Sequence, residues 1–340
     1  MVVFLMCCAA LWMAAPAAAQ PSADTSQAYR VYTSGGAPAT LDSIFAAMAQ
    51  RDVVLIGEVH NDPTAHTLQR QLLERAFQRH GAASDSADGR PIALSLEMFE
   101  RDVQPIVDEY LQGWITEQHF LQSSRPWSNY RTDYRPLVEF AKAHDLPVLA
   151  ANAPRRYVNR VSREGAASLS DLPASAKQWL PPLPLAEASP AYRAKWIGRM
   201  QAAMSPADST QARHPAPADT SDTTAHGAGR MSPHGHAMMA NMLQAQSLWD
   251  AAMAHSLTQY LIRQPDGLAL HVVGQFHISE GTGLPEHLAR YRPGTRTLSI
   301  VIEPADDIGA FDTETHRGLG DFVILTDAGR VPSTSERGSF

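Results

Sequence analysis

The chain has 340 residues, a formal net charge of −7 at pH 7 and 44% hydrophobic residues. This length and apolar content are enough for a globular protein with a sizeable core, in one large or two ordinary domains. The acidic balance, without any stretch dense in Lys and Arg, argues against a nucleic-acid-binding surface.

Residues 1–19 resemble an export signal, because they are apolar and uncharged and end in three alanines at 17–19. The segment is too short to predict a membrane span. Cys7 and Cys8 are the only cysteines and lie inside it, so the mature protein would have no disulfide and no thiolate metal site. The residues before Cys7 are not small, as a lipid-anchor signal requires. We therefore expect export to the periplasm or outer envelope, as a soluble protein rather than a lipoprotein.

The first predicted strand is the apolar run 53–56, which follows a flexible lead-in at 20–39 and a short helix. The run is typical of a strand buried on both faces, and Glu58 and His60 follow it directly. Asp62 is a good cap for the helix that the sequence predicts next. We therefore expect Glu58, His60 and His66 where a parallel strand passes into a helix, which is the ligand side of an open α/β sheet.

Two later apolar runs repeat this arrangement. The run that begins at 91 ends in Glu97, and the run that begins at 146 ends in Asn152, with Arg156 and Tyr157 just beyond. Because parallel strands end on the same edge of a sheet, Glu97 is expected to occupy the place on its strand that Glu58 occupies on the first.

A helical insert interrupts the α/β pattern at 162–240. Its first part consists of short helical pieces broken by prolines, and 205–236 is too poor in apolar residues to compensate the entropy of ordering. Four of the chain's 14 histidines lie in 205–236. Such tracts can bind metal or haem, but a disordered, solvated linker is the favoured interpretation, because ligands on a flexible loop lose affinity to ordering.

The sheet is predicted to resume after a long helix at 238–263 that carries Asp250. The next strand closes with His277, three residues after a glycine, in the same Gly-x-x-His spacing that ends in His60. Two further strands at 297–303 and 322–325 complete a three-layer α/β/α fold with a mostly parallel sheet. The expected organisation is a signal peptide at 1–19, a flexible lead-in at 20–39, an α/β core at 40–161 and 241–326, a helical insert at 162–240 and a tail at 327–340.

The paired Gly-x-x-His motifs predict a metal or ligand site. A single motif of this kind is usually only a hydrogen-bonded strand end, but its repetition, with Glu97 at a third strand end, makes a shared site at least as good an explanation. On this hypothesis His60 and His277 bind a divalent transition metal, and Glu58 or Glu97 completes the site or acts as a general base. The residues expected to contact or orient the ligand are His66, Asn152, Arg156, Tyr157 and Asp250.

Motifs of other enzyme classes are absent from the sequence. It contains no Gly-x-Ser-x-Gly elbow, no phosphate-binding loop, no Gly-x-Gly-x-x-Gly and no His-Glu-x-x-His. Hydride transfer and nucleotide chemistry are therefore disfavoured.

The ordered set of motifs resembles the ChaN family of bacterial haem-binding uptake proteins, within the group that includes Tiki, TraB and erythromycin-esterase-like proteins. The resemblance extends over roughly residues 40–304 and implies an α/β/α core with an inserted helical part. The motifs that carry it are Gly57-Glu58-Val59-His60 with His66, Leu96-Glu97-Met98-Phe99, Asn152-Ala153-Pro154, 246–254 and Gly274-Gln275-Phe276-His277.

The resemblance implies two functions. The first is an exported haem-binding protein of iron uptake, with the haem held at the carboxyl edge of the sheet or by the insert, and with Tyr157, Tyr192 or the His-rich tract as candidate iron ligands. The alternative is a metal-dependent hydrolase, in which His60, His277 and a glutamate would act as in Tiki-like proteases. A homodimer and an association with the envelope or membrane surface are compatible with either function.

Overall fold

The computed structural model describes residues 28–81, 89–204 and 233–332. Its centre is a single eight-stranded sheet with the order β2-β1-β8-β7-β3-β6-β4-β5. The strands from β8 to β5 are parallel, and β1 and β2 extend the other edge in antiparallel pairing. The strands are β1 Tyr29–Thr33, β2 Pro38–Ala39, β3 Val53–Glu58, β4 Ile92–Glu100, β5 Val148–Asn152, β6 Leu268–Gly274, β7 Thr297–Ala305 and β8 Phe322–Asp327.

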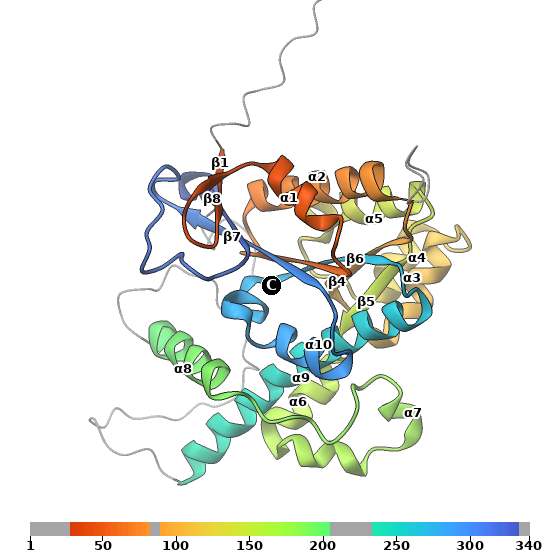
Figure 1. Cartoon of the computed structure of the whole chain (residues 1–340). Coiled ribbons are helices and arrows are strands. Elements are labelled where there is room, and N and C mark those ends of the chain that lie inside the picture. Colours follow the sequence, from red (N-terminus) through yellow and green to blue (C-terminus); the bar gives the residue numbers. More distant parts are fainter. Residues whose placement is uncertain (1–27, 82–88, 205–232, 333–340) are drawn as a thin grey trace, which may run out of the picture.

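Helices cover both faces of the sheet (Figure 1), which makes the three-layer α/β/α fold that the sequence predicts. One large apolar cluster packs α1, α2, α3 and α5 against one face, and a second packs α9 and α10 against the other. The helices are α1 Leu41–Met48, α2 Pro63–His80, α3 Gln104–Leu111, α4 Glu117–Ser124, α5 Arg135–Ala143, α6 Arg155–Glu164, α7 Ala174–Lys177, α8 Pro190–Met204, α9 Pro233–Arg263 and α10 Leu284–Tyr291.

The junction between β3 and α2 follows the local chemistry of its residues. All six residues of β3 are buried, as expected for a central strand of a parallel sheet. The Asp62 side chain then accepts hydrogen bonds from the N–H groups of Thr64 and Ala65, and Pro63 occupies the first turn. This cap ends the strand and starts the helix within four residues of Glu58, so Glu58 and His60 lie at the carboxyl edge of the sheet.

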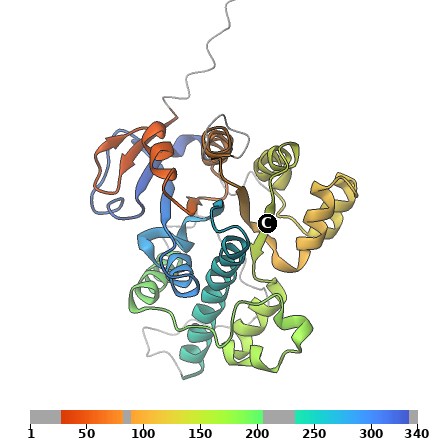
Figure 2. The same cartoon turned by 45° about the vertical axis from the view of Figure 1, so that its right-hand side comes forward.

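The helical insert gathers at one end of the molecule. The helices α6, α7 and α8 lie around the N-terminal half of α9, as Figures 1 and 2 show from two directions. A separate apolar cluster joins α6 and the turns after it to α9. No helix in the described ranges has the length and apolar character to span a membrane.

Three sequence-based boundaries are wrong in detail. The lead-in 20–39 is not flexible throughout: residues 29–33 form β1, because Val31 and Tyr32 bury their side chains and the backbone pairs with β8. The long helix begins at Pro233, so the end of the tract 205–236 is helical. The strand that leads to His277 ends at Gly274, and a short 3₁₀ turn carries the histidine. The signal segment 1–19 and most of the His-rich tract lie outside the described residues.

Candidate functional site at the carboxyl edge of the sheet

The two Gly-x-x-His motifs lie side by side, because β3 and β6 are neighbouring parallel strands. Glu58 is in register with Gly274 across this pair. A Cβ atom added to Gly274 would lie 2.9 Å from Cε1 of His60. Segments more than two hundred residues apart in the sequence therefore meet at one edge of the sheet, and the glycine permits this close approach.

The first motif is organised around the buried carboxylate of Glu58. It accepts hydrogen bonds from His60 Nδ1 at 2.9 Å, from the Tyr134 hydroxyl at 2.5 Å and from the Gln69 amide. Nδ1 of His66 lies 3.3 Å from the second oxygen of Glu58. Strand β3, helix α2 and the turn before α5 thus converge on one acid, which satisfies the hydrogen-bonding demand of a buried carboxylate.

This network holds a proton on His66 and keeps Glu58 ionised. Burial opposes both charges, but the interaction with Glu58, supported by Asp133, raises the pKa of His66 to about 9. Burial likewise opposes ionisation of Glu58, yet His66 and His60 lower its pKa to about 2. The pair is therefore a buried ion pair at neutral pH.

The second motif forms a network around His277. Its Nδ1 lies 2.6 Å from Asp250 of α9, and its Nε2 lies 3.5 Å from Glu97 of β4. Asp250 also accepts a hydrogen bond from the buried Tyr192 hydroxyl of α8. The other oxygen of Glu97 accepts the N–H of Gly274 at 2.6 Å. A helix of the insert is therefore bonded directly to the edge of the sheet.

In this second network, too, the imidazole is protonated and the carboxylate is ionised. Burial disfavours the charged imidazolium, but Asp250 and Glu97 outweigh it and raise the pKa of His277 to about 10. Burial raises the pKa of Glu97, but His277 more than reverses this effect and holds it well below its usual range. His277 therefore carries a proton on both ring nitrogens at neutral pH, and this form has no lone pair for a metal.

A metal site is not preformed within the described part of the chain, where no group of three or more His, Cys, Asp or Glu side chains has a suitable arrangement. Metal binding at Nε2 of His277 would require that nitrogen to lose its proton, while Nδ1 could keep its hydrogen bond to Asp250. The divalent-metal role of these two histidines, and the acid–base role of Glu58 and Glu97, stay predictions.

The remaining predicted ligand contacts lie apart from the two networks. The Asn152 side chain accepts the next backbone N–H at 2.8 Å. Arg156 forms an ion pair with Asp102 at 2.5 Å and lies 4.6 Å above the ring of Tyr157. Arg156 and Tyr157 thus contact Asp102 and each other.

Sequence reasoning did not identify Gln69, Asp133 and Tyr134 as members of the site. Gln69 follows His66 by three residues on α2, so the helical period would have revealed it. Asp133 and Tyr134 come from a π-helical turn before α5, and such a turn has no periodic sequence signal. Tyr192, considered above as an iron ligand, is instead buried and bonded to Asp250.

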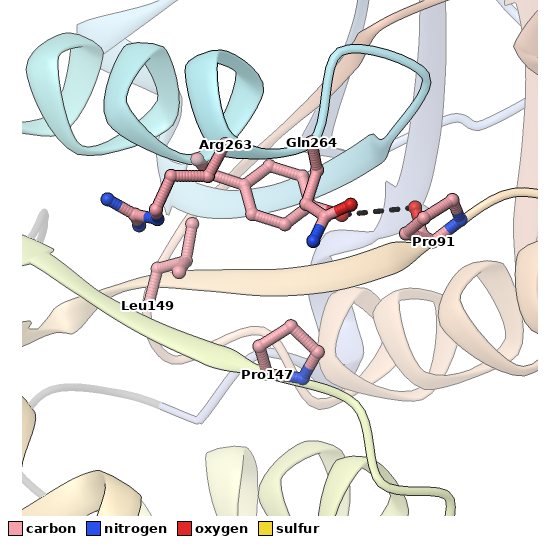
Figure 3. A pocket seen from close by; sticks show the side chains of 6 residues that line it. Pro91, Pro147, Leu149, Arg263 and Gln264 are labelled. Carbon is pink, nitrogen blue, oxygen red and sulfur yellow. Dashed lines mark hydrogen bonds between the residues drawn. The ribbon is translucent and has the colours of Figure 1, made fainter.

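A small apolar cavity of about 280 Å³ lies at the opposite edge of the sheet (Figure 3). It lies by the start of β4 and β5 and the end of α9, where the Tyr260 hydroxyl donates a hydrogen bond to the Pro91 carbonyl at 3.0 Å. It is therefore remote from the two histidine motifs. Its lining residues are Pro91, Pro147, Leu149, Tyr260, Arg263 and Gln264.

The two networks predict how the free energy of unfolding depends on pH. The pKa of Glu58 is lowered from 4.5 to about 2, so its contribution is present above pH 4.5 and is lost as the pH falls through about 2. The pKa of His66 is raised from 6.5 to about 9, so its contribution is complete below pH 6.5 and is lost as the pH rises through about 9. We expect urea unfolding to show highest stability between pH 4.5 and 6.5. A profile that keeps rising above this range would contradict the assignment.

Comparisons with known proteins agree with this geometry. Residues 44–288 match the family model described as "Haem-binding uptake, Tiki superfamily, ChaN". The structure "Cofacial heme binding to ChaN of Campylobacter jejuni" has a TM-score of 0.58 and 13% identity, and covers 88% of this chain and 98% of that chain. An erythromycin esterase in its open conformation has a TM-score of 0.42 and 11% identity over 81% of this chain and 77% of its own, which is too low to carry an argument.

A curated plant protein is also similar in sequence. "Protein RETICULATA-RELATED 5, chloroplastic" of Arabidopsis thaliana is 21% identical over 258 residues, which are 74% of this chain and 31% of that protein. The chain thus spans about a third of the length of this relative. The family match covers both histidine motifs and the insert between them, and it confirms the resemblance noted from the sequence. The chain belongs to the ChaN family of haem-binding uptake proteins in the Tiki superfamily.

Proposed function

We propose that this protein binds haem in the course of iron uptake outside the cytoplasm, and that the surface shared by α8 and α9 holds the haem. The observation that carries this proposal is an exposed apolar surface on the insert of a chain that belongs to a haem-binding family. Export is the part of the proposal that rests on the sequence of residues 1–19 alone.

The α8–α9 face is defined here as Ile197 and Met200 of α8 with Met238, Met239 and Met242 of α9. Ile197 is 38% exposed and Met238 is 52% exposed, and both are among the few large apolar side chains at the surface. The other three methionines are partly buried around Tyr192, Trp196 and Leu243. Exposed apolar side chains beside an apolar cluster are a candidate binding site, and methionine adapts to the flat apolar ring of a porphyrin.

Cationic side chains lie beside this face. Lys195 and Arg199 lie 4.9 Å and 5.7 Å from the ring centroid of Phe276, which packs against the α8–α9 cluster. Lys195 already donates to the carbonyl oxygens of Phe276 and Ser279, at 2.9 and 2.7 Å. The exposed Arg199 is therefore the better partner for the haem carboxylates.

His236 is the imidazole that fits an iron ligand on this face. It is exposed on α9 and precedes Met239 by three residues, so the two side chains share one side of the helix. The buried alternatives are engaged, because His277 holds two protons and Tyr192 donates to Asp250. Bound haem would supply the iron, and the chain would supply an imidazole, thioethers and a cation to hold it.

Haemin titration of the purified protein tests this function. We expect a saturable Soret shift in the wild type, and an affinity about 10- to 100-fold lower for His236→Ala because the iron loses its ligand. His119→Ala is the matched control, since His119 is an exposed histidine on α4, in another part of the chain. Absence of a saturable Soret shift in the wild type would refute haem binding.

A second variant tests the location separately. Ile197→Glu places a charge on the α8–α9 face and should weaken haem binding without affecting the buried core, because the side chain is exposed. If both Ile197→Glu and His236→Ala bind haemin as the wild type does, haem binds elsewhere.

The metal-dependent hydrolase is not favoured. The matching family model describes haem-binding uptake. The homodimer and the envelope association stay proposals. Sedimentation with and without haemin tests the first, and fractionation of cells that express the full chain tests export and envelope association together.

A further inference from the structure

A second feature, outside both histidine networks and the α8–α9 face, is the guanidinium of Arg101. This residue follows β4 directly, and its side chain is partly buried against α9. Nη1 lies 2.9 Å from Nδ1 of His255. Because a guanidinium can only donate, Nδ1 must accept and His255 is neutral. Burial, together with the charge of Arg101, accordingly lowers the pKa of His255 to about 4.

Arg101 has no carboxylate partner among the described residues within the 4.0 Å limit of an ion pair. The flanking acids are directed elsewhere: Glu100 binds Arg125 at 3.0 Å, and Asp102 binds Arg125 at 2.8 Å and Arg156 at 2.5 Å. Burial lowers the pKa of Arg101 to about 10, and the only opposing influence is Tyr291. A partly buried cation is normally paired, so the protein leaves this charge uncompensated.

One further donor lies near the guanidinium. Tyr291 of α10 lies with its ring centroid 5.8 Å from that of His255, and its hydroxyl makes no hydrogen bond to another residue in the described part of the chain. Because Nδ1 of His255 accepts from Arg101, Nε2 carries the proton, and it faces the side-chain amide of Gln259 at 3.2 Å. The place where β4, α9 and α10 meet thus presents a cation and a phenolic hydroxyl, and among the described residues no carboxylate lies within 4.0 Å of the cation.

We propose that Arg101, His255 and Tyr291 form a binding site for a small oxyanion, a carboxylate or a phosphate. A guanidinium binds two oxygens of such a group with parallel hydrogen bonds, and here His255 orients it from one side. The site is separate from the α8–α9 face, because His255 lies 17 residues beyond Met238 on α9. That separation corresponds to roughly 25 Å along the helix.

Thermal unfolding in inorganic phosphate and in acetate tests the site, with chloride at matched ionic strength as the reference. We expect either oxyanion to raise the Tm of the wild type and of Arg125→Met, in which a guanidinium paired with acids is removed, but not of Arg101→Met. Without oxyanion, Arg101→Met should unfold at the wild-type temperature or above, because an uncompensated charge is replaced by an apolar chain. An equal rise in Tm for the wild type and Arg101→Met would overturn the proposal.

A second variant tests the site independently, in case Arg101→Met does not fold. Tyr291→Phe removes one hydroxyl and should weaken phosphate binding about 3- to 10-fold, the value of one hydrogen bond, and unchanged affinity would overturn the role of Tyr291. Haemin titration of Arg101→Met tests whether the site is separate from the haem. Unchanged haemin affinity is expected for a site of a free oxyanion, and weaker haemin affinity would overturn the separation of this site from the haem-binding surface.

Discussion

Asp250→Ala is expected to lower the free energy of unfolding by about 3–5 kcal/mol, because the buried positive charge of His277 loses a carboxylate partner. Asp250 is fully buried and accepts hydrogen bonds from both His277 and Tyr192. Without it, the protonated imidazole of His277 keeps Glu97 at 3.5 Å as its carboxylate partner. Chemical denaturation of the variant and the wild type at neutral pH measures the difference.

A matched control and a spectroscopic readout sharpen this test. Asp266→Ala removes an exposed carboxylate from the turn after α9 and should change stability by less than about 0.5 kcal/mol. In Asp250→Ala the pKa of His277 should fall, because burial lowers it and Asp250 is the largest influence that raises it. An NMR titration that finds this pKa unchanged, or a variant as stable as the Asp266→Ala control, would show that the network does not hold the charge.

Gly57→Ala is expected to lower the free energy of unfolding by about 1–3 kcal/mol, the usual cost of overpacking a core. The added methyl group would lie 2.9 Å from Cα of Gln275 and 2.9 Å from a side-chain carbon of Ile278. The first of these is backbone, in the turn that carries His277, so it cannot move without moving the histidine. Denaturation together with the His277 resonances measures both effects.

Gly35→Ala is the matched control for this substitution. A Cβ atom at Gly35 meets nothing within 4 Å, so the variant should retain wild-type stability within about 0.5 kcal/mol. If Gly57→Ala is equally neutral, the two motifs are not packed as closely as described here, and the case for a shared site loses its geometric basis.

The sheet could be predicted from the sequence because its parallel strands are buried on both faces. The runs that became β3, β4 and β6 are mostly apolar, as is typical of strands buried on both faces. Strand β1 was missed because just two of its five residues, Val31 and Tyr32, are buried. Its position depends on pairing with β8 at the other end of the chain, which no local pattern reveals.

The site could be predicted only in part, because local sequence patterns do not reveal contacts between distant segments. Glu58 ends β3, His60 and His277 follow the ends of β3 and β6, and Glu97 lies in β4 just beyond its last pair with β6. The geometry of parallel strands brings these positions together. Asn152 also ends a strand, but its side chain is used by its own backbone. Which side chain turns toward the others depends on packing between segments, and the sequence carries no direct signal for this.

Two hydrogen bonds link α8 to the second histidine motif, from Tyr192 to Asp250 and from His277 to Asp250. This link limits which helical inserts the scaffold can accept. One end of the link comes from the insert and the other from the sheet, so the insert is not an independent module. A chimera that grafts a foreign insert onto this scaffold must bring a tyrosine that matches the Asp250–His277 pair of the host. Evolution of the α8–α9 face is therefore tied to the second histidine motif, and the two are expected to diverge together.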